Sequence, residues 1–156
     1  MLMIKRTCPG AWVDFNGHMR DAYYVLLISF ANDQTMEELG MGPRYLAAKG
    51  RTLYNLDTRI RYRKEAHGGD PLIVEMRLID HDTKRLHLHS LIRHETTRAV
   101  LAVNESVLLH VNQAGPEGRP AAEAFPPHIA AMVEARHQRD GTVAEADRVG
   151  SVGLGR

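Results

Sequence analysis

The chain has 156 residues, of which 44% are hydrophobic and 25% charged, close to the average of a globular domain. Its formal net charge of +1 gives no support for binding to nucleic acid or to an anionic membrane surface. The single cysteine, Cys8, cannot form an internal disulfide, and no apolar run reaches the ~20 residues that a membrane-spanning helix needs. Residues 1–10 also lack the apolar stretch of a signal peptide, so we expect a cytoplasmic protein without a membrane partner.

The first predicted elements are a strand over residues 4–13 and a tight turn. Pro9-Gly10 places this strand at a sheet edge or marks a bulge. Asn16-Gly17 supplies the turn, because glycine adopts positive φ without steric cost. Asp21 is expected to cap the helix that follows. The segment therefore predicts a carboxylate, Asp14, close to the unpaired N–H groups of a helix N-terminus, where an oxyanion is stabilised.

Residues 22–39 are predicted to form one long helix that ends at Gly40. Its first half is apolar on nearly every side, which is typical of a buried helix, and its second half is polar. A short helix is expected over residues 43–49, with Pro43 in its first turn and Gly50 at its end.

Four strands are predicted next, over residues 52–62, 72–78, 86–93 and 100–112, because polar and apolar residues alternate there. The first of these places Tyr54 and Tyr62 on one face, and the last places Glu105 within an otherwise apolar row. Such alternation indicates an antiparallel sheet with one face covered. The fold class is therefore α+β, with an antiparallel sheet wrapped around one long buried helix, which is the hotdog arrangement.

Residues 1–112 are expected to form this domain. Residues 113–139 are expected to be a linker rich in glycine, proline and alanine, with a short helix over 128–138. Residues 140–156 show no periodicity, and we expect them to be disordered.

The segment Asp14-Phe15-Asn16-Gly17-His18-Met19-Arg20-Asp21-Ala22-Tyr23-Tyr24 resembles the D-x-x-G-H-V-N-N-A-x-Y pattern of hotdog-fold acyl-CoA thioesterases. The resemblance is to the branch that includes 4-hydroxybenzoyl-CoA thioesterase, and it covers residues 4–112. Residues 78–87 and 108–112 are more narrowly similar to the betainyl-CoA thioesterases of carnitine breakdown. The sequence departs from the pattern at Arg20, where asparagine is usual.

The resemblance implies hydrolysis of a short acyl-CoA, with coenzyme A as part of the substrate and no further cofactor. By this match, Asp14 is the nucleophile or general base, and the backbone N–H of Asp21 polarises the thioester carbonyl. His18 is mainly structural. The active sites of this family lie at a dimer interface, so a homodimer or homotetramer is implied. From the residues alone, the favoured interpretation is that Asp14 shapes the turn through its own side-chain hydrogen bonds, and the catalytic role rests on the resemblance.

Several residues are candidate substrate contacts, each with a structural alternative. Gly17 belongs to the turn. Glu105 either faces a cationic acyl group, or lies at a bulge or beside a buried partner such as Arg59. Three tyrosines either offer aromatic faces to a quaternary ammonium or simply pack in the core: Tyr23, Tyr24 and Tyr54. Four basic residues either form a clamp for the phosphates of coenzyme A or belong to a solvated face of the sheet: Arg61, Arg63, Lys84 and Arg85.

Other chemistries find less support in the sequence. The histidines His81, His87, His89 and His94 lack a cysteine or second paired-histidine motif to complete a tetrahedral site, so no metal is expected. The chain has no G-x-S-x-G nucleophile motif. Two alternatives remain. One is a hotdog enoyl-CoA hydratase, although the D-x-N-P-x-H spacing is not met, and the other is a non-catalytic protein that binds acyl-CoA.

Overall fold

The computed structural model describes residues 1–150 and 153–154. The helices are α1 (Asp21–Glu38), α2 (Pro43–Lys49) and α3 (Pro127–Asp140). The strands are β1 (Leu2–Thr7), β2 (Arg51–Tyr62), β3 (Pro71–His81), β4 (Arg85–His94), β5 (Val100–Asn112) and β6 (Ala121–Ala122). Short 3-10 turns lie at Gly10–Trp12, Pro116–Gly118 and Glu145–Asp147.

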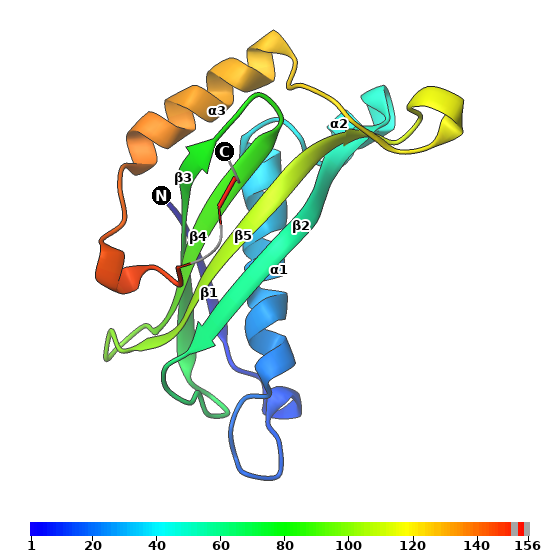
Figure 1. Ribbon diagram of the computed structural model, residues 1–156. Coiled ribbons are helices and arrows are strands. Elements are labelled where there is room, and N and C mark those ends of the chain that lie inside the picture. Colours follow the sequence, from blue (N-terminus) through cyan, green and yellow to red (C-terminus); the bar gives the residue numbers. More distant parts are fainter. Residues whose placement is uncertain (151–152, 155–156) are drawn as a thin grey trace.

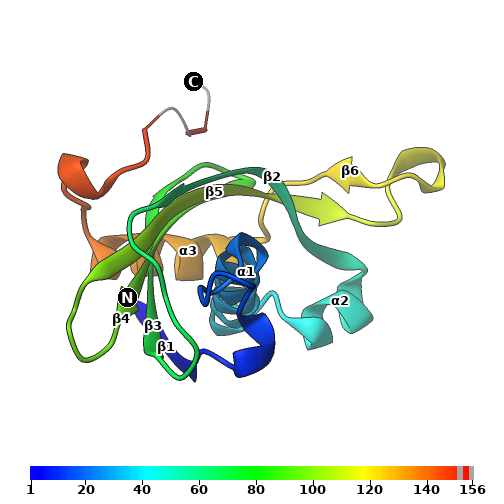
Figure 2. The same cartoon turned by 90° about the horizontal axis from the view of Figure 1, so that it is seen from below.

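The strands form one antiparallel sheet in the order β1-β3-β4-β5-β2, with β6 paired to β5. The sheet curls, and α1 lies along its concave face (Figures 1 and 2). Leu27, Ile28 and Ala31 of α1 are buried in the core that the sheet encloses. The expected hotdog fold is therefore confirmed. No helix in the described part of the chain is long and apolar enough to cross a membrane.

The first strand ends earlier than predicted, at Thr7, because Pro9 has no N–H to donate to a neighbouring strand. Residues 10–12 form a 3-10 turn instead. Helix α1 begins at Asp21, and its N-cap is Arg20, whose side chain makes no capping hydrogen bond. The prediction that Asp21 is the N-cap is therefore wrong by one residue.

A β-bulge in β2 changes which side chains share a face of that strand, so the prediction for this strand is wrong. Tyr54 pairs with Leu109 and Asn55 with Leu108, but Asp57 pairs with Val107, so Leu56 is the extra residue. A bulge adds one residue and reverses the alternation of side chains beyond it. Consequently Tyr54 and Tyr62, which the sequence places on one face, lie on opposite faces of the sheet.

In β5 the apolar row that contains Glu105 faces away from α1 over residues 103–107. Ser106 and Leu108 lie on the face toward α1, and both are buried. Val103, Glu105 and Val107 lie on the outer face, where Val103 and Val107 pack against Val149. Strand β5 is covered on both sides, so its sequence alone does not reveal which row faces the helix.

The C-terminal segment differs from the expected disordered tail over its described residues. After α3 the chain forms the 3-10 turn at Glu145–Asp147 and passes over the outer face of the sheet (Figure 2). Val149 is buried in a cluster with Val103 and Val107 of that face. Helix α3 lies where a short helix is expected, and its Ile129 and Val133 join the main core.

Candidate active site

The loop between β1 and α1 is a closed turn at one end of the sheet (Figure 1). Val13 and Met19 form a backbone bridge, and the Asp14 N–H donates to the His18 carbonyl at 2.9 Å. Gly17 has a φ of +81°, which favours glycine, and its N–H donates to the Asp14 carbonyl at 3.1 Å. Gly17 is therefore required by the shape of the turn.

The Asp14 carboxylate uses its two oxygens differently. Oδ1 accepts hydrogen bonds from the backbone N–H groups of Asn16 at 2.8 Å and His18 at 3.2 Å. Oδ2 has only a 3.5 Å contact with the side-chain amide of Asn16. One oxygen thus fixes the side chain in the turn and leaves the other available to a reacting group.

These contacts also set the charge of Asp14. Desolvation is the largest influence and raises the pKa of the Asp14 carboxyl, but hydrogen bonds from Asn16 and His18 together outweigh it. The pKa of Asp14 therefore lies below its ordinary value. The carboxylate is ionised at neutral pH, as a nucleophile or a general base must be.

Asp21 begins α1, so its N–H belongs to the first turn, whose N–H groups have no partner within the helix. Its side chain accepts a hydrogen bond from the Ala22 N–H at 2.9 Å, and its carbonyl accepts one from the Tyr62 hydroxyl at 3.4 Å. The positive end of the helix dipole lies at the same place, where it favours a developing negative charge.

A cleft of about 330 Å³ opens beside this helix end. Tyr24 and Tyr62 meet there edge to face, with ring centroids 5.3 Å apart. The Tyr24 hydroxyl is held by the backbone, since it accepts from the Ala66 N–H at 3.1 Å and donates to the Lys64 carbonyl at 3.4 Å. The lining residues are His18, Met19, Asp21, Tyr24, Tyr62, Arg63, Lys64 and Glu65.

Four predicted site residues therefore line this cleft: His18, Asp21, Tyr24 and Arg63. Asp14 is tied to His18 through the turn but is not among the residues that line the cleft of a single chain. His18 also forms a backbone bridge with His67, and their rings meet at right angles, 5.2 Å apart.

The other predicted contacts lie elsewhere. Tyr23 stacks on Trp12 with ring centroids 4.7 Å apart, and Tyr54 is exposed on the outer face of β2. Arg61 is exposed on that face near the cleft end of β2. Lys84 and Arg85 lie at the β3–β4 hairpin, at the end of the sheet opposite the turn, and Arg85 pairs with Asp82. The predicted phosphate clamp is thus not assembled within one chain.

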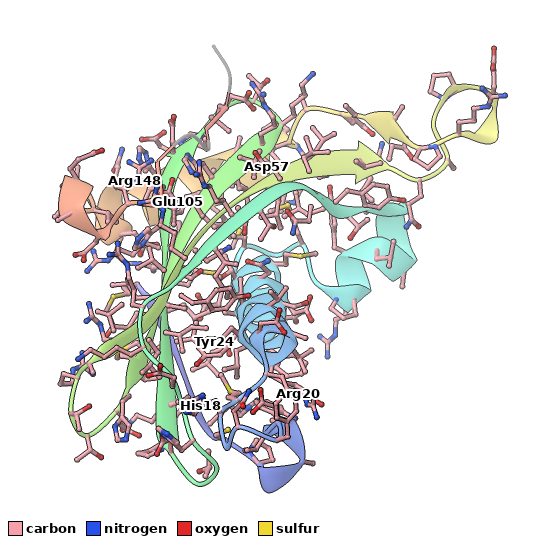
Figure 3. All side chains as sticks on the ribbon, turned by 60° about the horizontal axis from the view of Figure 1, so that its bottom comes forward. His18, Arg20, Tyr24, Asp57, Glu105 and Arg148 are labelled. Carbon is pink, nitrogen blue, oxygen red and sulfur yellow. The ribbon has the colours of Figure 1, made fainter. Side chains whose placement is uncertain are left out.

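Glu105 does not face the cleft. It is completely buried on the outer face of the sheet, where both carboxylate oxygens are held by Arg148, at 2.7 and 2.9 Å. His87 Nε2 lies 2.9 Å from Oε2, and the Val149 N–H donates to Oε1 at 2.9 Å. Figure 3 shows Glu105 beside Arg148 and away from His18 and Tyr24.

Burial is the largest influence on Glu105 and raises the pKa of its carboxyl, but the bonds from His87, Arg148 and Val149 outweigh it and lower the pKa to about 2. The partner of Glu105 is thus Arg148, whereas the sequence suggested Arg59, which instead donates to the Gly150 carbonyl at 3.0 Å. The only signal in the sequence was the acid itself, because a buried carboxylate requires a cation.

Sequence reasoning also missed a second hollow, of about 220 Å³, between α1 and β2. Asn32 lines it, and its buried Oδ1 has no hydrogen-bond partner among the described residues. Ser29, Asn55 and Thr58 lie around the same hollow. Apolar side chains such as Ile28 and Leu53 line it as well, so the hollow next to the edge strand is of mixed character.

The chain was compared with known proteins. A family profile described as the thioesterase-like superfamily matches residues 8–133. A betainyl-CoA thioesterase of Pseudomonas aeruginosa is 37% identical over 141 residues, which are 90% of this chain and 86% of that protein. An L-carnitine dehydrogenase/betainyl-CoA thioesterase of Agrobacterium fabrum is 41% identical over 103 residues, 66% of this chain and 21% of that longer protein. A Staphylococcus aureus protein solved in complex with CoA superposes with a TM-score of 0.83 at 24% identity, covering 91% of this chain and 87% of that one.

Proposed function

The chain belongs to the thioesterase-like superfamily, and on that premise we propose that it hydrolyses a short acyl-CoA, with betainyl-CoA as its substrate. Water and the thioester give the free acid and the thiol of coenzyme A. The observation that carries this proposal is the 37% identity to a betainyl-CoA thioesterase over 90% of the chain. The turn before α1 supplies a chemical basis for the same reaction.

In the proposed reaction, Asp14 Oδ2 acts in one of two ways that give the same products. As a nucleophile it attacks the thioester carbon, the C–S bond breaks, coenzyme A leaves as its thiolate, and water then hydrolyses the anhydride. As a general base it takes a proton from the attacking water, and that proton passes to the departing thiolate as the C–S bond breaks. The Asp21 N–H, at the start of α1, donates a hydrogen bond to the carbonyl oxygen as negative charge develops on it. A single donor of this kind stabilises a transition state by ~3 kcal/mol. Because Asp14 does not line the cleft of one chain, we propose that a second copy completes the site in a homodimer.

The cleft beside α1 suits the proposed substrate. Arg63 and Lys64 line it and offer cations for the phosphates of coenzyme A. Tyr24 and Tyr62 present aromatic edges and faces, and Asp21 and Glu65 add negative charge. Aromatic rings and carboxylates together favour a quaternary ammonium such as that of the betainyl group.

The substrate is tested by measuring thiol release from betainyl-CoA and from 3,3-dimethylbutanoyl-CoA. The second compound has the same shape but carries carbon in place of the charged nitrogen. We expect kcat/KM to be about tenfold higher for betainyl-CoA, which corresponds to ~1.4 kcal/mol of cation recognition. Equal values would contradict the assignment of the acyl group.

Thiol release, measured together with binding of betainyl-CoA and hydration of an enoyl-CoA, separates the alternative functions. Binding of betainyl-CoA without thiol release from any acyl-CoA would identify a non-catalytic binding protein. Addition of water to an enoyl-CoA without loss of the thiol would identify a hydratase.

The role of Asp14 is tested by comparing Asp14→Asn with Asp14→Ala. Asparagine keeps an Oδ1 that accepts from Asn16 and His18 but loses the charged oxygen. We expect Asp14→Asn to lower kcat by about a thousandfold, or ~4 kcal/mol, with the melting temperature unchanged. Asp14→Ala should lose both activity and part of the stability. Near-normal turnover by Asp14→Asn would overturn the assignment.

A further inference from the structure

A cluster of three side chains lies where α3 crosses the end of β3, far along the sheet from the turn before α1 (Figure 1). His81 comes from the last residue of β3, and Glu134 and His137 come from α3. Each offers one ligand atom, and these atoms all lie within 4.8 Å of one another. The spacing of three residues places Glu134 and His137 on the same side of the helix.

The cluster is already organised by hydrogen bonds. His81 Nε2 lies 3.2 Å from Glu134 Oε2, and the rings of His81 and His137 meet at right angles with centroids 5.1 Å apart. His137 Nε2 lies 3.1 Å from the Ile79 carbonyl, to which it donates. Gln138 Nε2 donates to Glu134 Oε1 at 2.7 Å.

These outer contacts are the kind that hold metal ligands. A histidine that binds a metal through one ring nitrogen usually donates its other N–H to a backbone carbonyl or carboxylate, which fixes the tautomer. The bond from His137 to Ile79 does this and leaves Nδ1 with its lone pair. The bond from Gln138 orients one oxygen of Glu134 and leaves the other directed toward His81.

We propose that His81, Glu134 and His137 bind a divalent transition-metal ion of the zinc type. Two imidazoles and one carboxylate suit Zn²⁺, with water as the fourth ligand. In a tetrahedral zinc site the ligand atoms are ~3.4 Å apart, so small side-chain rotations would bring these three to the metal.

The surroundings leave room for the ion and for its water. A cavity of about 410 Å³ adjoins the cluster and is lined by His81, Thr83 and Glu134 among others. The nearby cation of α3, Arg136, pairs with Glu38 and Asp140, so it does not neutralise Glu134. The metal would fasten α3 to the end of β3 and would take no part in hydrolysis.

The test uses the full chain without an affinity tag, stripped with a chelator and titrated with Zn²⁺ and with Co²⁺. We expect one equivalent of metal to bind, the melting temperature to rise by several degrees, and Co²⁺ to give the visible absorption of a four-coordinate site. His81→Gln, Glu134→Gln and His137→Gln should each weaken binding by at least tenfold.

The matched control is His128→Gln, because His128 is an exposed histidine on the same helix outside the cluster. It should bind metal like the unmodified protein. A cooperative thermal unfolding transition of each metal-free variant would show that the variant is folded, so that a loss of metal binding is not a loss of structure. A double variant that carries both His81→Gln and His137→Gln gives the decisive comparison. If it binds metal as tightly as the unmodified protein, the proposal is overturned, whatever the thioesterase activity.

Discussion

Asp14 and Glu105 are two carboxylates whose pKa values are both lowered, but their partners give them different roles. Asp14 is held through one oxygen by backbone N–H groups, and its other oxygen has only a 3.5 Å contact. Glu105 is fully buried, and both oxygens bind the guanidinium of Arg148. Only Asp14 therefore has an oxygen that can react with a substrate.

The low pKa of Glu105 makes the stability of the protein depend on pH. The pKa of this carboxyl is about 2 in the folded chain against a model-compound value of 4.5. Its stabilising contribution is therefore complete above pH 4.5 and is lost as the pH falls toward 2. The shift corresponds to about 3 kcal/mol.

We expect Glu105→Gln to lower the free energy of unfolding by about 3 kcal/mol at pH 7, with the difference narrowing below pH 4. Urea unfolding of both proteins at several pH values measures this. Glu95→Gln is the control, because Glu95 forms an exposed pair with Lys5 and should change stability by less than ~1 kcal/mol. If the difference in unfolding free energy between the unmodified protein and Glu105→Gln does not vary with pH, the low pKa assigned to Glu105 is contradicted.

At the level of single residues, the sequence predicts groups whose contacts are local. The turn at Asn16-Gly17 and the carboxylate of Asp14 before it lie within a few residues of each other, so their bonds follow from turn chemistry. The partner of Glu105 is 43 residues away, in a segment without periodicity, and no local pattern identifies it. The hollow at Asn32 depends in the same way on how α1 meets β2.

Among the secondary-structure elements, the segment after α3 depends most on a single contact. Arg148 binds Glu105, and the adjacent Val149 N–H donates to the same carboxylate at 2.9 Å. Val149 then packs against Val103 and Val107. Two other hydrogen bonds of its described residues link the segment to the sheet, from His89 to the Asp147 carbonyl at 2.8 Å and from Arg59 to the Gly150 carbonyl at 3.0 Å. The pair of Arg148 with the buried Glu105 joins two charged groups, so we expect it to be the strongest of these links.

We expect Arg148→Met to detach this segment while the rest of the fold remains. Methionine keeps much of the side-chain length but cannot pair with Glu105. Hydrogen exchange measured by mass spectrometry should be faster over residues 141–150 and unchanged in α1. Arg139→Met is the matched control, since the Arg139 side chain is exposed and its ion pair with Asp140 is long, at 4.0 Å. Unchanged protection of the Val149 amide in Arg148→Met would refute this account.

The element order and the boundaries of the main helices follow from the sequence because their signals are strong. Gly40 and Gly50 end α1 and α2 with positive φ, and the β2–β3 and β3–β4 turns carry glycine or aspartate. The faces of β2 are not predicted correctly, and those of β5 are not distinguished. In β2, a bulge at Leu56 reverses the alternation of inward and outward side chains. In β5, burial of both faces makes the row that faces α1 indistinguishable in the sequence.

For the whole molecule, β2 is the important boundary, because it is an edge of the sheet. It is 12 residues long and exposes Tyr54, Leu56 and Tyr62. A long exposed edge with apolar side chains favours pairing with another strand. This supports the proposed homodimer, and we propose in addition that its two copies pair through β2 and complete the candidate active site there.

We expect Leu56→Lys to shift the protein from dimer to monomer in analytical ultracentrifugation and to reduce thiol release strongly. Lysine on an edge strand opposes pairing through charge. Met132→Lys is the control, because Met132 is similarly exposed but lies on α3. A monomeric unmodified protein, or a Leu56→Lys protein that remains dimeric, would contradict pairing through β2.

The docked C-terminal segment limits how larger assemblies can be built. Residues 148–149 occupy the convex side of the sheet, so another sheet cannot stack back to back there without first displacing them. Displacement would strip Glu105 of its counter-ion and leave an uncompensated charge at the new contact. We therefore expect any tetramer to join its dimers through helices, with this side of each subunit left outermost.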